Sequence, residues 1–194
     1  MKVLLAGISL VLLASPAAAA DGNSGWYMGV GAGPSGIHSV CSTVEAATPL
    51  DSCDDESVAW KVFVGRTSSK YWGIEFSYVD AGEANVTASP SAGTLVVNPR
   101  TLTAYGTLDI PLGDRFGIFG KAGLSYFNTT YERTGVFRAL PSGDDGLEGA
   151  LGAGFRIRIL KDIGVRFEWE HFNDAVGIGS GDVDTSMVSL MYRF

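Results

Sequence analysis

Hydrophobic and polar residues alternate with a period of two along most of the chain. For example, Ile118 and Leu124 fall on one face of their segment and Lys121 falls on the other. Successive side chains of a β-strand point to opposite faces of the sheet, so this period predicts strands. The predicted strands are Trp26–Gly33, Val58–Gly65, Tyr71–Asp80, Thr101–Ile110, Phe116–Tyr126, Leu147–Ile159, Ile163–His171 and Thr185–Phe194.

The predicted strands are long, and their connections alternate between long and short. Strands of about ten residues exceed the ~5–6 of ordinary sheets and match the ~9–11 that cross a bilayer with tilt. Long loops on one side and short turns on the other are typical of outer-membrane barrels. The long connections are 34–57, 81–100, 127–146 and 173–183, and the short ones are 66–70, 111–115 and 160–162. The first long connection has no Lys or Arg but carries the acidic residues Glu45, Asp51, Asp54, Asp55 and Glu56.

The two faces of the predicted strands differ in polarity. One face is uniformly apolar and carries all four tryptophans, whereas the charged residues fall on the other. No predicted helix or second sheet covers the apolar face, so we expect it to face lipid, and an open sheet edge is not tolerated in hydrocarbon. The sequence therefore predicts an all-β, eight-stranded antiparallel up-and-down transmembrane β-barrel. A soluble lipocalin-like barrel, with the apolar face inside, is the alternative. The tryptophans are Trp26, Trp60, Trp72 and Trp169, and all but Trp60 lie near a strand end, as in interfacial aromatic girdles.

The N-terminal segment has the features of a secretory signal peptide. Lys2 gives a positive start, Val3–Leu13 is apolar, and Ala18–Ala20 supplies small residues for cleavage. The apolar stretch is shorter than the ~20 residues of a spanning helix. We therefore expect residues 1–20 to be removed and 21–194 to form a single exported barrel domain. An uncleaved anchor is the alternative, although a Ser-Pro-Ala sequence interrupts it before the alanines.

Composition excludes several classes of protein. Only 18% of residues are charged and 46% are hydrophobic, which argues against a disordered chain. The 26 glycines follow no three-residue period, which argues against collagen. A net charge of −7 without a basic patch argues against nucleic-acid binding. Two His and two Cys are too few for a zinc framework, and we expect neither a cofactor nor a metal.

Five stretches resemble the OmpA-like family of small outer-membrane barrels, namely GWYMGVGAG, GIEFSYVDAG, PLGDRFGIFGKAGLSY, GVRFEWEHF and MVSLMYRF. The resemblance covers essentially all of 21–194 and implies a bacterial outer-membrane protein in contact with lipid and lipopolysaccharide; we expect a monomer. The last stretch resembles the signal read by the barrel-assembly machinery, with Val188, Leu190, Tyr192 and Phe194 on one face. Because the chain ends at Phe194, we expect no periplasmic peptidoglycan-binding domain.

Charged residues on the inward face predict an ion network in the lumen. At ~3.3 Å per residue from the short turns, Lys61, Glu75, Lys121, Arg156, Arg166 and Glu168 fall in one layer, with Asp109 just below and Glu170 just above it. An unpaired charge in this space would be costly, so we expect each to have partners. The resemblance implies that Glu75, Lys121, Arg166 and Glu168 match charged lumen positions of the family, and that Tyr105 stands where a Lys is often found. The network is interpreted as a structural plug, with a gate of rearranging ion pairs as the alternative.

The first long connection contains both cysteines, Cys41 and Cys53. In an exported protein they have one possible pairing, and the closed loop would stabilise the fold by ~3 kcal/mol. We favour a disulfide over two free thiols. The acidic run Asp51–Glu56 and the pair Asp182 and Asp184 are interpreted as solvated acidic loops, because their spacing does not match a calcium loop. Divalent cations shared with lipopolysaccharide are the alternative.

An enzyme is not predicted. Some eight-stranded outer-membrane barrels hydrolyse lipid A with a His-x-Ser pair, but His171 is followed by Phe172 and Asn173. His171 is expected to face lipid at the interface, and no nucleophile lies within reach of it along the sequence. The sequence therefore predicts a non-enzymatic integral outer-membrane protein with a charge-plugged lumen. A small gated pore and a loop-mediated adhesin or ligand binder are the alternatives.

Overall fold

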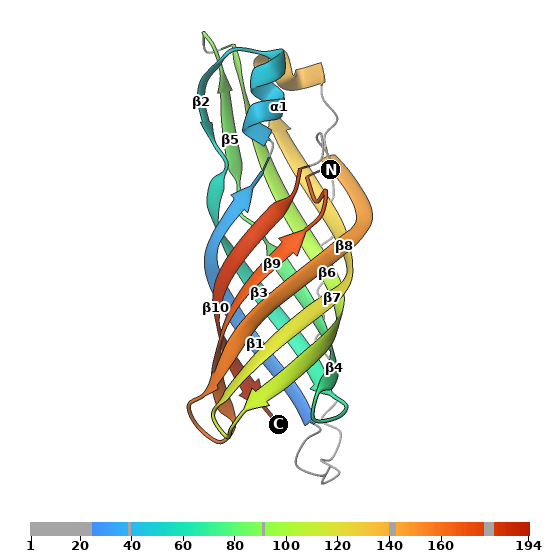
Figure 1. The fold of residues 1–194 in the computed structure, drawn as a ribbon. Coiled ribbons are helices and arrows are strands. Elements are labelled where there is room, and N and C mark those ends of the chain that lie inside the picture. The colour runs from blue at the N-terminus through green and yellow to red at the C-terminus, as the bar shows by residue number, and fades with distance from the viewer. Residues whose placement is uncertain (1–24, 39, 91, 140–142, 177–180) are drawn as a thin grey trace, which may run out of the picture.

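The computed structural model describes residues 25–38, 40–90, 92–139, 143–176 and 181–194, so the predicted signal peptide lies outside the described residues. Within them, eight antiparallel strands form a closed barrel (Figure 1). Strand β1 pairs with both β3 and β10, and β6 pairs with β7, so the sheet closes on itself. The predicted fold class is confirmed. The barrel strands are β1 (Gly25–Ile37), β3 (Glu56–Thr67), β4 (Trp72–Asp80), β6 (Gly93–Leu112), β7 (Phe116–Arg133), β8 (Gly143–Arg158), β9 (Ile163–Phe172) and β10 (Val183–Arg193).

Three short turns lie at one end of the barrel, between β3 and β4, β6 and β7, and β8 and β9. They overlap the predicted short connections 66–70, 111–115 and 160–162, although the first two residues of 66–70 belong to β3 and those of 111–115 belong to β6. Gly113, with a positive φ of 86°, stands in the turn after β6, where a residue without a Cβ is favoured. The first and last described residues meet at the same end, where the Phe194 amide donates to the Trp26 carbonyl at 2.9 Å. Short turns are periplasmic in outer-membrane barrels, so this is the periplasmic end.

The opposite end differs from the prediction of long loops. Helix α1 (Val40–Ala47), strands β2 (Leu50–Asp54) and β5 (Ala84–Ala88) and the 3₁₀ helix η1 (Gly135–Ala139) all lie there. Strands β2 and β5 pair with each other, and β5 pairs with the first residues of β6. The loops expected at 34–57, 81–100 and 127–146 are therefore wrong for much of their length. We call the part formed by α1, β2, β5, η1, Gly93–Arg100 and Phe127–Arg133 the extracellular projection (Figure 1).

The two faces of the strands exchange polarity between the barrel and the extracellular projection. In the lower part of β6, Leu102 is exposed on the outside and Thr103 is buried inside. In the upper part of the same strand, Leu95 and Val97 are fully buried inside, and Thr94 lies outside. The alternation keeps its period of two and reverses its phase. Sequence patterning ended the strand at this reversal because the apolar face was assumed to stay outside.

The extracellular projection has an apolar core of its own. Its inward side chains belong to one cluster that includes Val40 and Val44 of α1, Val86 of β5, and Leu95 of β6. The predicted disulfide is confirmed: Cys41 of α1 is bonded to Cys53 of β2, with an S–S distance of 2.01 Å. The helix is thereby fixed to the strand that leads into β3. No helix in the described residues is long and apolar enough to cross a membrane.

The outside of the barrel is apolar, as predicted, and carries all four tryptophans. Trp26 and Trp72 lie beside the periplasmic turns, at the start of β1 and β4. Trp60 and Trp169 lie nearer the extracellular projection, and Trp60 packs against Tyr78 with ring centroids 5.5 Å apart. Two aromatic levels therefore flank the band of aliphatic side chains, as expected for a barrel surrounded by lipid.

Candidate functional site: an ion network inside the barrel

Six charged side chains meet inside the barrel. Strand alternation points all of them inward, and their side chains are 0% exposed except that of Arg166, at 4%. They come from four strands: Lys61 from β3, Glu75 from β4, Lys121 from β7, and Arg166, Glu168 and Glu170 from β9. The predicted network residues that the structure brings together are these six.

Glu168 is the most connected carboxylate. One oxygen accepts from Lys61 Nζ, and the other lies 3.0 Å from Lys121 Nζ and 2.9 Å from Arg166 Nη2. Ser189 Oγ of β10 also donates to it, at 3.3 Å. Alternation on β9 places Arg166 and Glu168 on the same face, so the two side chains of one strand are partners in the same network.

The other two carboxylates complete the connections. Glu75 lies 2.6 Å from Arg166 Nη1 and 3.0 Å from Lys121 Nζ. Glu170 lies 2.7 Å from Lys121 Nζ and 3.0 Å from Lys61 Nζ. Lys121 therefore contacts three carboxylates. Three cations and three anions give the network a formal charge of zero, which is the condition under which buried charges are tolerated.

Two tyrosine hydroxyl groups donate to the network, Tyr27 to Glu75 at 3.0 Å and Tyr105 to Glu170 at 3.1 Å. The Arg166 guanidinium lies over the Phe119 ring, 4.3 Å from its centroid, which adds a cation–π contact. Aromatic side chains thus contact the ionic groups directly. Alternation had placed Tyr27 on the inward face, but nothing in the sequence marked it or Ser189 as partners of carboxylates.

Inward glycines make room for the large side chains. A Cβ built on Gly65 would lie 2.3 Å from Tyr27 Cζ, and one on Gly152 would lie 2.7 Å from Lys121 Cε. Both are closer than real Cβ contacts allow. These glycines therefore allow Tyr27 and Lys121 to reach across the narrow interior.

Arg156 and Asp109 form a pair apart from the six. Arg156 Nη2 lies 2.5 Å from Asp109 Oδ1, and their side chains are 15% and 18% exposed. The prediction that Arg156 shares a layer with Lys121 is not matched, because it bonds to Asp109 nearer the periplasmic turns. The stagger of tilted strands in a barrel separates residues that lie at similar distances from their turns.

Apolar and hydroxyl side chains share the interior between the network and the extracellular projection. Thr101 stands opposite Phe127, and its buried Oγ1 has no hydrogen-bond partner in the described residues. Phe127, Phe172 and Met187 are each at most 5% exposed and belong to the same cluster as the core of the extracellular projection. On the periplasmic side, by contrast, a small cavity of about 20 Å³ reaches Glu75 and Arg166. The network therefore lies between a packed upper interior and a lower interior with space.

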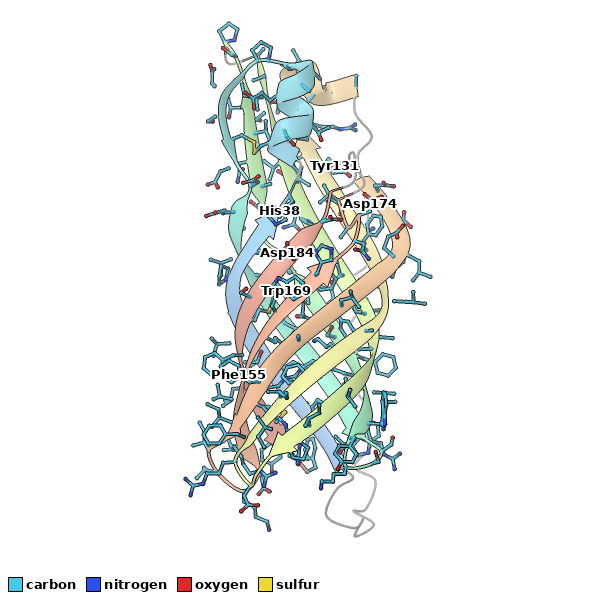
Figure 2. All side chains as sticks on the ribbon, in the orientation of Figure 1. His38, Tyr131, Phe155, Trp169, Asp174 and Asp184 are labelled. Carbon is cyan, nitrogen blue, oxygen red and sulfur yellow. A yellow bond between two sulfur atoms is a disulfide. The ribbon has the colours of Figure 1, made fainter. Side chains whose placement is uncertain are left out.

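Acidic and histidine residues at the extracellular rim form contacts with one another that the sequence did not predict. His171 faces outward and stacks on Trp169, with ring centroids 5.9 Å apart. Its Nδ1 lies 2.9 Å from one oxygen of Asp184, whose other oxygen lies 2.9 Å from His38 Nε2 (Figure 2). Asp184 is therefore held between two histidines rather than in a solvated loop. The other nitrogen of His171 faces Asn173 at 3.0 Å.

Most of the remaining predicted residues lie on or beside strands. In the predicted acidic loop, Asp51 and Asp54 belong to β2 and Glu56 begins β3; Asp182, beside β10, accepts from the Asp174 amide at 3.0 Å. In the part of the chain that the structure describes, no group of three or more potential metal ligands is found. The C-terminal residues that resemble an assembly signal all face outward on or just after β10: Val188, Leu190, Tyr192 and Phe194.

Comparisons with known proteins agree with this architecture. Among solved structures, Ail of Yersinia pestis bound to the heparin analogue sucrose octasulfate has a TM-score of 0.55 at 13% identity, over 89% of this chain and 99% of that one. Neisserial surface protein A has a TM-score of 0.58 at 10% identity, over 88% and 99%. OprG from Pseudomonas aeruginosa has a TM-score of 0.55 at 16% identity, over 88% and 96%.

These likenesses concern the fold alone, and no curated protein sequence matches the chain significantly. A family model described as "Outer membrane protein beta-barrel domain" matches residues 5–194. That match spans nearly the whole sequence and every strand of the barrel. The chain therefore belongs to the family of outer-membrane β-barrel domains and is a protein of the bacterial outer membrane.

Proposed function

We propose that this protein is a non-enzymatic, non-conducting barrel whose lumen is closed by the ion network and by the apolar layer above it. The extracellular projection then supplies the surface that acts outside the cell. The observation that carries the proposal is the burial of the network, with Lys61, Glu75 and Glu170 each 0% exposed beneath packed side chains that include Phe127 and Phe172.

Opening a path for ions would require both layers to rearrange. Lys121 would have to leave three carboxylates, and removing one partner of a buried ion pair typically costs about 3–5 kcal/mol. Phe127 and Phe172 would also have to leave a packed core. A gate that rearranges only the ion pairs would still be blocked by the aromatic side chains.

Planar-bilayer recording tests the closed lumen. The purified barrel should give no reproducible conductance steps, and neither should Lys161→Ala, a matched control that removes a lysine from a periplasmic turn. Steady current in the unmodified protein that disappears in Glu75→Ala would establish the gated pore instead. Folding of each variant is checked by the slower gel migration of the boiled sample.

The surroundings of His171 support a non-enzymatic role. Its two ring nitrogens face Asp184 and Asn173, and no serine or cysteine nucleophile is bonded to it in the described residues. The mass spectrum of lipid A from cells that produce the protein should therefore match that from cells with an empty vector. A deacylated species that depends on His171 would contradict this.

The charge of the extracellular projection favours cationic ligands as a second candidate function. In the described residues, the extracellular projection and the adjoining rim have three basic residues, Arg100, Arg133 and Arg138. Their acidic residues are Glu45, Asp51, Asp54, Asp55, Glu56, Asp80, Glu83, Glu132, Asp144, Asp145, Asp174, Asp182 and Asp184. A polyanion such as the heparin analogue bound by Ail would be repelled by this excess of negative charge. Nanodisc-embedded protein should retain polylysine at low salt and not sucrose octasulfate; the reverse preference would reject this ligand class.

Export and assembly follow the usual route in this proposal. Cleavage after Ala20 should leave Asp21 as the first residue of the mature protein, which N-terminal sequencing tests. The outward residues Tyr192 and Phe194 are proposed to be read by the barrel-assembly machinery. Deleting Phe194 should therefore lower the amount of folded protein in the outer membrane, whereas Val136→Ala on the extracellular projection should not.

A further inference from the structure

The periplasmic end of the barrel is basic, in contrast to the acidic extracellular projection. Among the residues that the structure describes, its acidic residues are Asp109, Asp114 and Asp162. Its basic residues are Arg66, Lys70, Arg115, Arg156, Arg158, Lys161 and Arg193. A chain with a formal charge of −7 thus concentrates positive charge at this end. Neither the closed lumen nor the extracellular surface accounts for it.

Part of this charge lines a cavity. A vestibule of about 400 Å³ opens at the periplasmic end and is lined by Lys70, Arg156, Arg158 and Arg193, with Asp109 and Asp114. Its volume lies within the range of small-molecule sites. The small cavity that reaches Glu75 and Arg166 shares Arg156, Asp109 and Arg193 with it, so the vestibule leads toward the base of the ion network.

The arginines of the vestibule lack enough anionic partners. Asp109 neutralises only Arg156, through Nη2, and the buried Nε of Arg156 has no hydrogen-bond partner in the described residues. Within the same residues, Arg158 and Arg193 form no ion pair, and Lys70 lies 5.3 Å from the centroid of the Tyr71 ring. Like charges held in one partly enclosed space repel each other, and a bound anion would relieve that repulsion.

We propose that the vestibule binds a phosphate group, presented by a small periplasmic phosphomonoester, by inorganic phosphate or by an anionic lipid headgroup. Three guanidinium groups around one space suit phosphate, whose oxygens accept pairs of parallel N–H bonds. A carboxylate or chloride offers fewer acceptors to the same donors. The proposal is independent of whether the lumen conducts.

Phosphate titration of the mature protein in phosphatidylcholine nanodiscs tests the site. With 100 mM NaCl to screen the general field, calorimetry should show saturable binding of one inorganic phosphate. Arg193→Gln and Arg156→Gln should each raise the Kd about tenfold, as expected when a charged hydrogen-bond donor is lost. Arg193→Gln keeps the Asp109 pair intact, so it remains informative if Arg156→Gln folds poorly.

Arg115→Gln is the matched control, because it removes the same charge from the same end but does not line the vestibule. Its Kd should stay within twofold of the unmodified protein. Absence of saturable phosphate binding, or an equal loss in Arg115→Gln, would overturn the proposal.

A second set of nanodiscs containing phosphatidylglycerol distinguishes the sources of the phosphate group. An unchanged Kd for inorganic phosphate would assign the vestibule to soluble phosphates. A Kd raised by phosphatidylglycerol in the unmodified protein, but not in Arg193→Gln, would show that a lipid headgroup competes for the same arginines. Both results support the site, and they differ only in what carries the phosphate.

Discussion

Strands β6 and β7 pass through two regions of the molecule that differ in which face of the sheet is apolar. In the membrane span, Ala104 and Leu124 point outward and the inward residues include Thr103 and Lys121. In the extracellular projection, Thr130 of β7 points outward, and the inward residues of β6 include Leu95 and Val97. The period of two shows that both regions are strands. Which face is apolar depends on the medium around each region, hydrocarbon or water.

The difference shows two ways to fill the inside of one continuous sheet. Hydrocarbon around the span takes the apolar side chains, which leaves charged groups to neutralise one another in the interior. Water around the extracellular projection takes the polar side chains, and an ordinary apolar core forms inside. The variants below separate the two interiors, from the largest expected effect to the smallest.

Lys121→Ala should have the largest effect, because it leaves three buried carboxylates without a shared cation. Loss of one partner of a buried ion pair predicts a decrease of about 4 kcal/mol in the free energy of unfolding. Urea titration in lipid vesicles, followed by tryptophan fluorescence, measures it. Lys161→Ala at the turn after β8 is the control, and a loss equal to the control would show that the network does not hold the span.

Leu95→Ala should destabilise the extracellular projection while leaving the span folded. Leu95 is fully buried, and truncation of such a leucine costs about 3 kcal/mol. The expected readout is faster proteolysis near β5 and β6 with unchanged gel migration of the unboiled barrel. If the barrel itself unfolded at lower urea, the two regions would form one cooperative unit rather than two.

Reduction of the Cys41–Cys53 disulfide should also act on the extracellular projection alone. The bond closes a loop with a sequence separation of 12, for which chain entropy predicts a stabilisation of about 3 kcal/mol that strain or residual structure can lower. Hydrogen exchange of α1 amides should accelerate on reduction, whereas amides of β9 should not change. Equal acceleration in β9 would contradict a local role.

Arginine substitutions on the outside of β7 should have the smallest effect and depend on the region. Ala122→Arg places a charge in the hydrocarbon near mid-span and should cost about 2 kcal/mol. Thr130→Arg, on the same face above the membrane, should stay within about 0.5 kcal/mol. Refolding into vesicles followed by urea titration compares them, and equal costs would reject the proposed boundary between the regions.

Much of the membrane-spanning part could be predicted from sequence, because it depends on the alternation of residues within each strand. Alternation located the strands, and the face that carries Trp60 and Trp169 identified the outside. The predicted strands ended too early, at the point where the apolar face changes from outside to inside. Leu95 and Val97 were assigned to a loop, because the sequence does not show that η1 and α1 cover them. Coverage of this kind depends on contacts between distant segments, which periodicity does not report.

The sequence predicted which charged residues face the lumen, but only some of the contacts between them. Parity alone placed Lys121 and Glu168 inside, and the structure pairs them. The position of Arg156 depends on the shear of the barrel, which one sequence does not reveal. The contact of Asp184 with His38 was also out of reach, because it joins residues separated by 146 positions across the rim.

Spin labelling of the outward positions of β7 tests the central claim most directly. Single cysteines at Ala122, Leu124, Asn128 and Thr130, each carrying a nitroxide in lipid vesicles, report collisions with apolar oxygen and with a water-soluble nickel complex. The account predicts oxygen-dominated collisions at Ala122 and Leu124 and nickel-dominated collisions at Asn128 and Thr130. Nickel access that is uniform along the strand would contradict it.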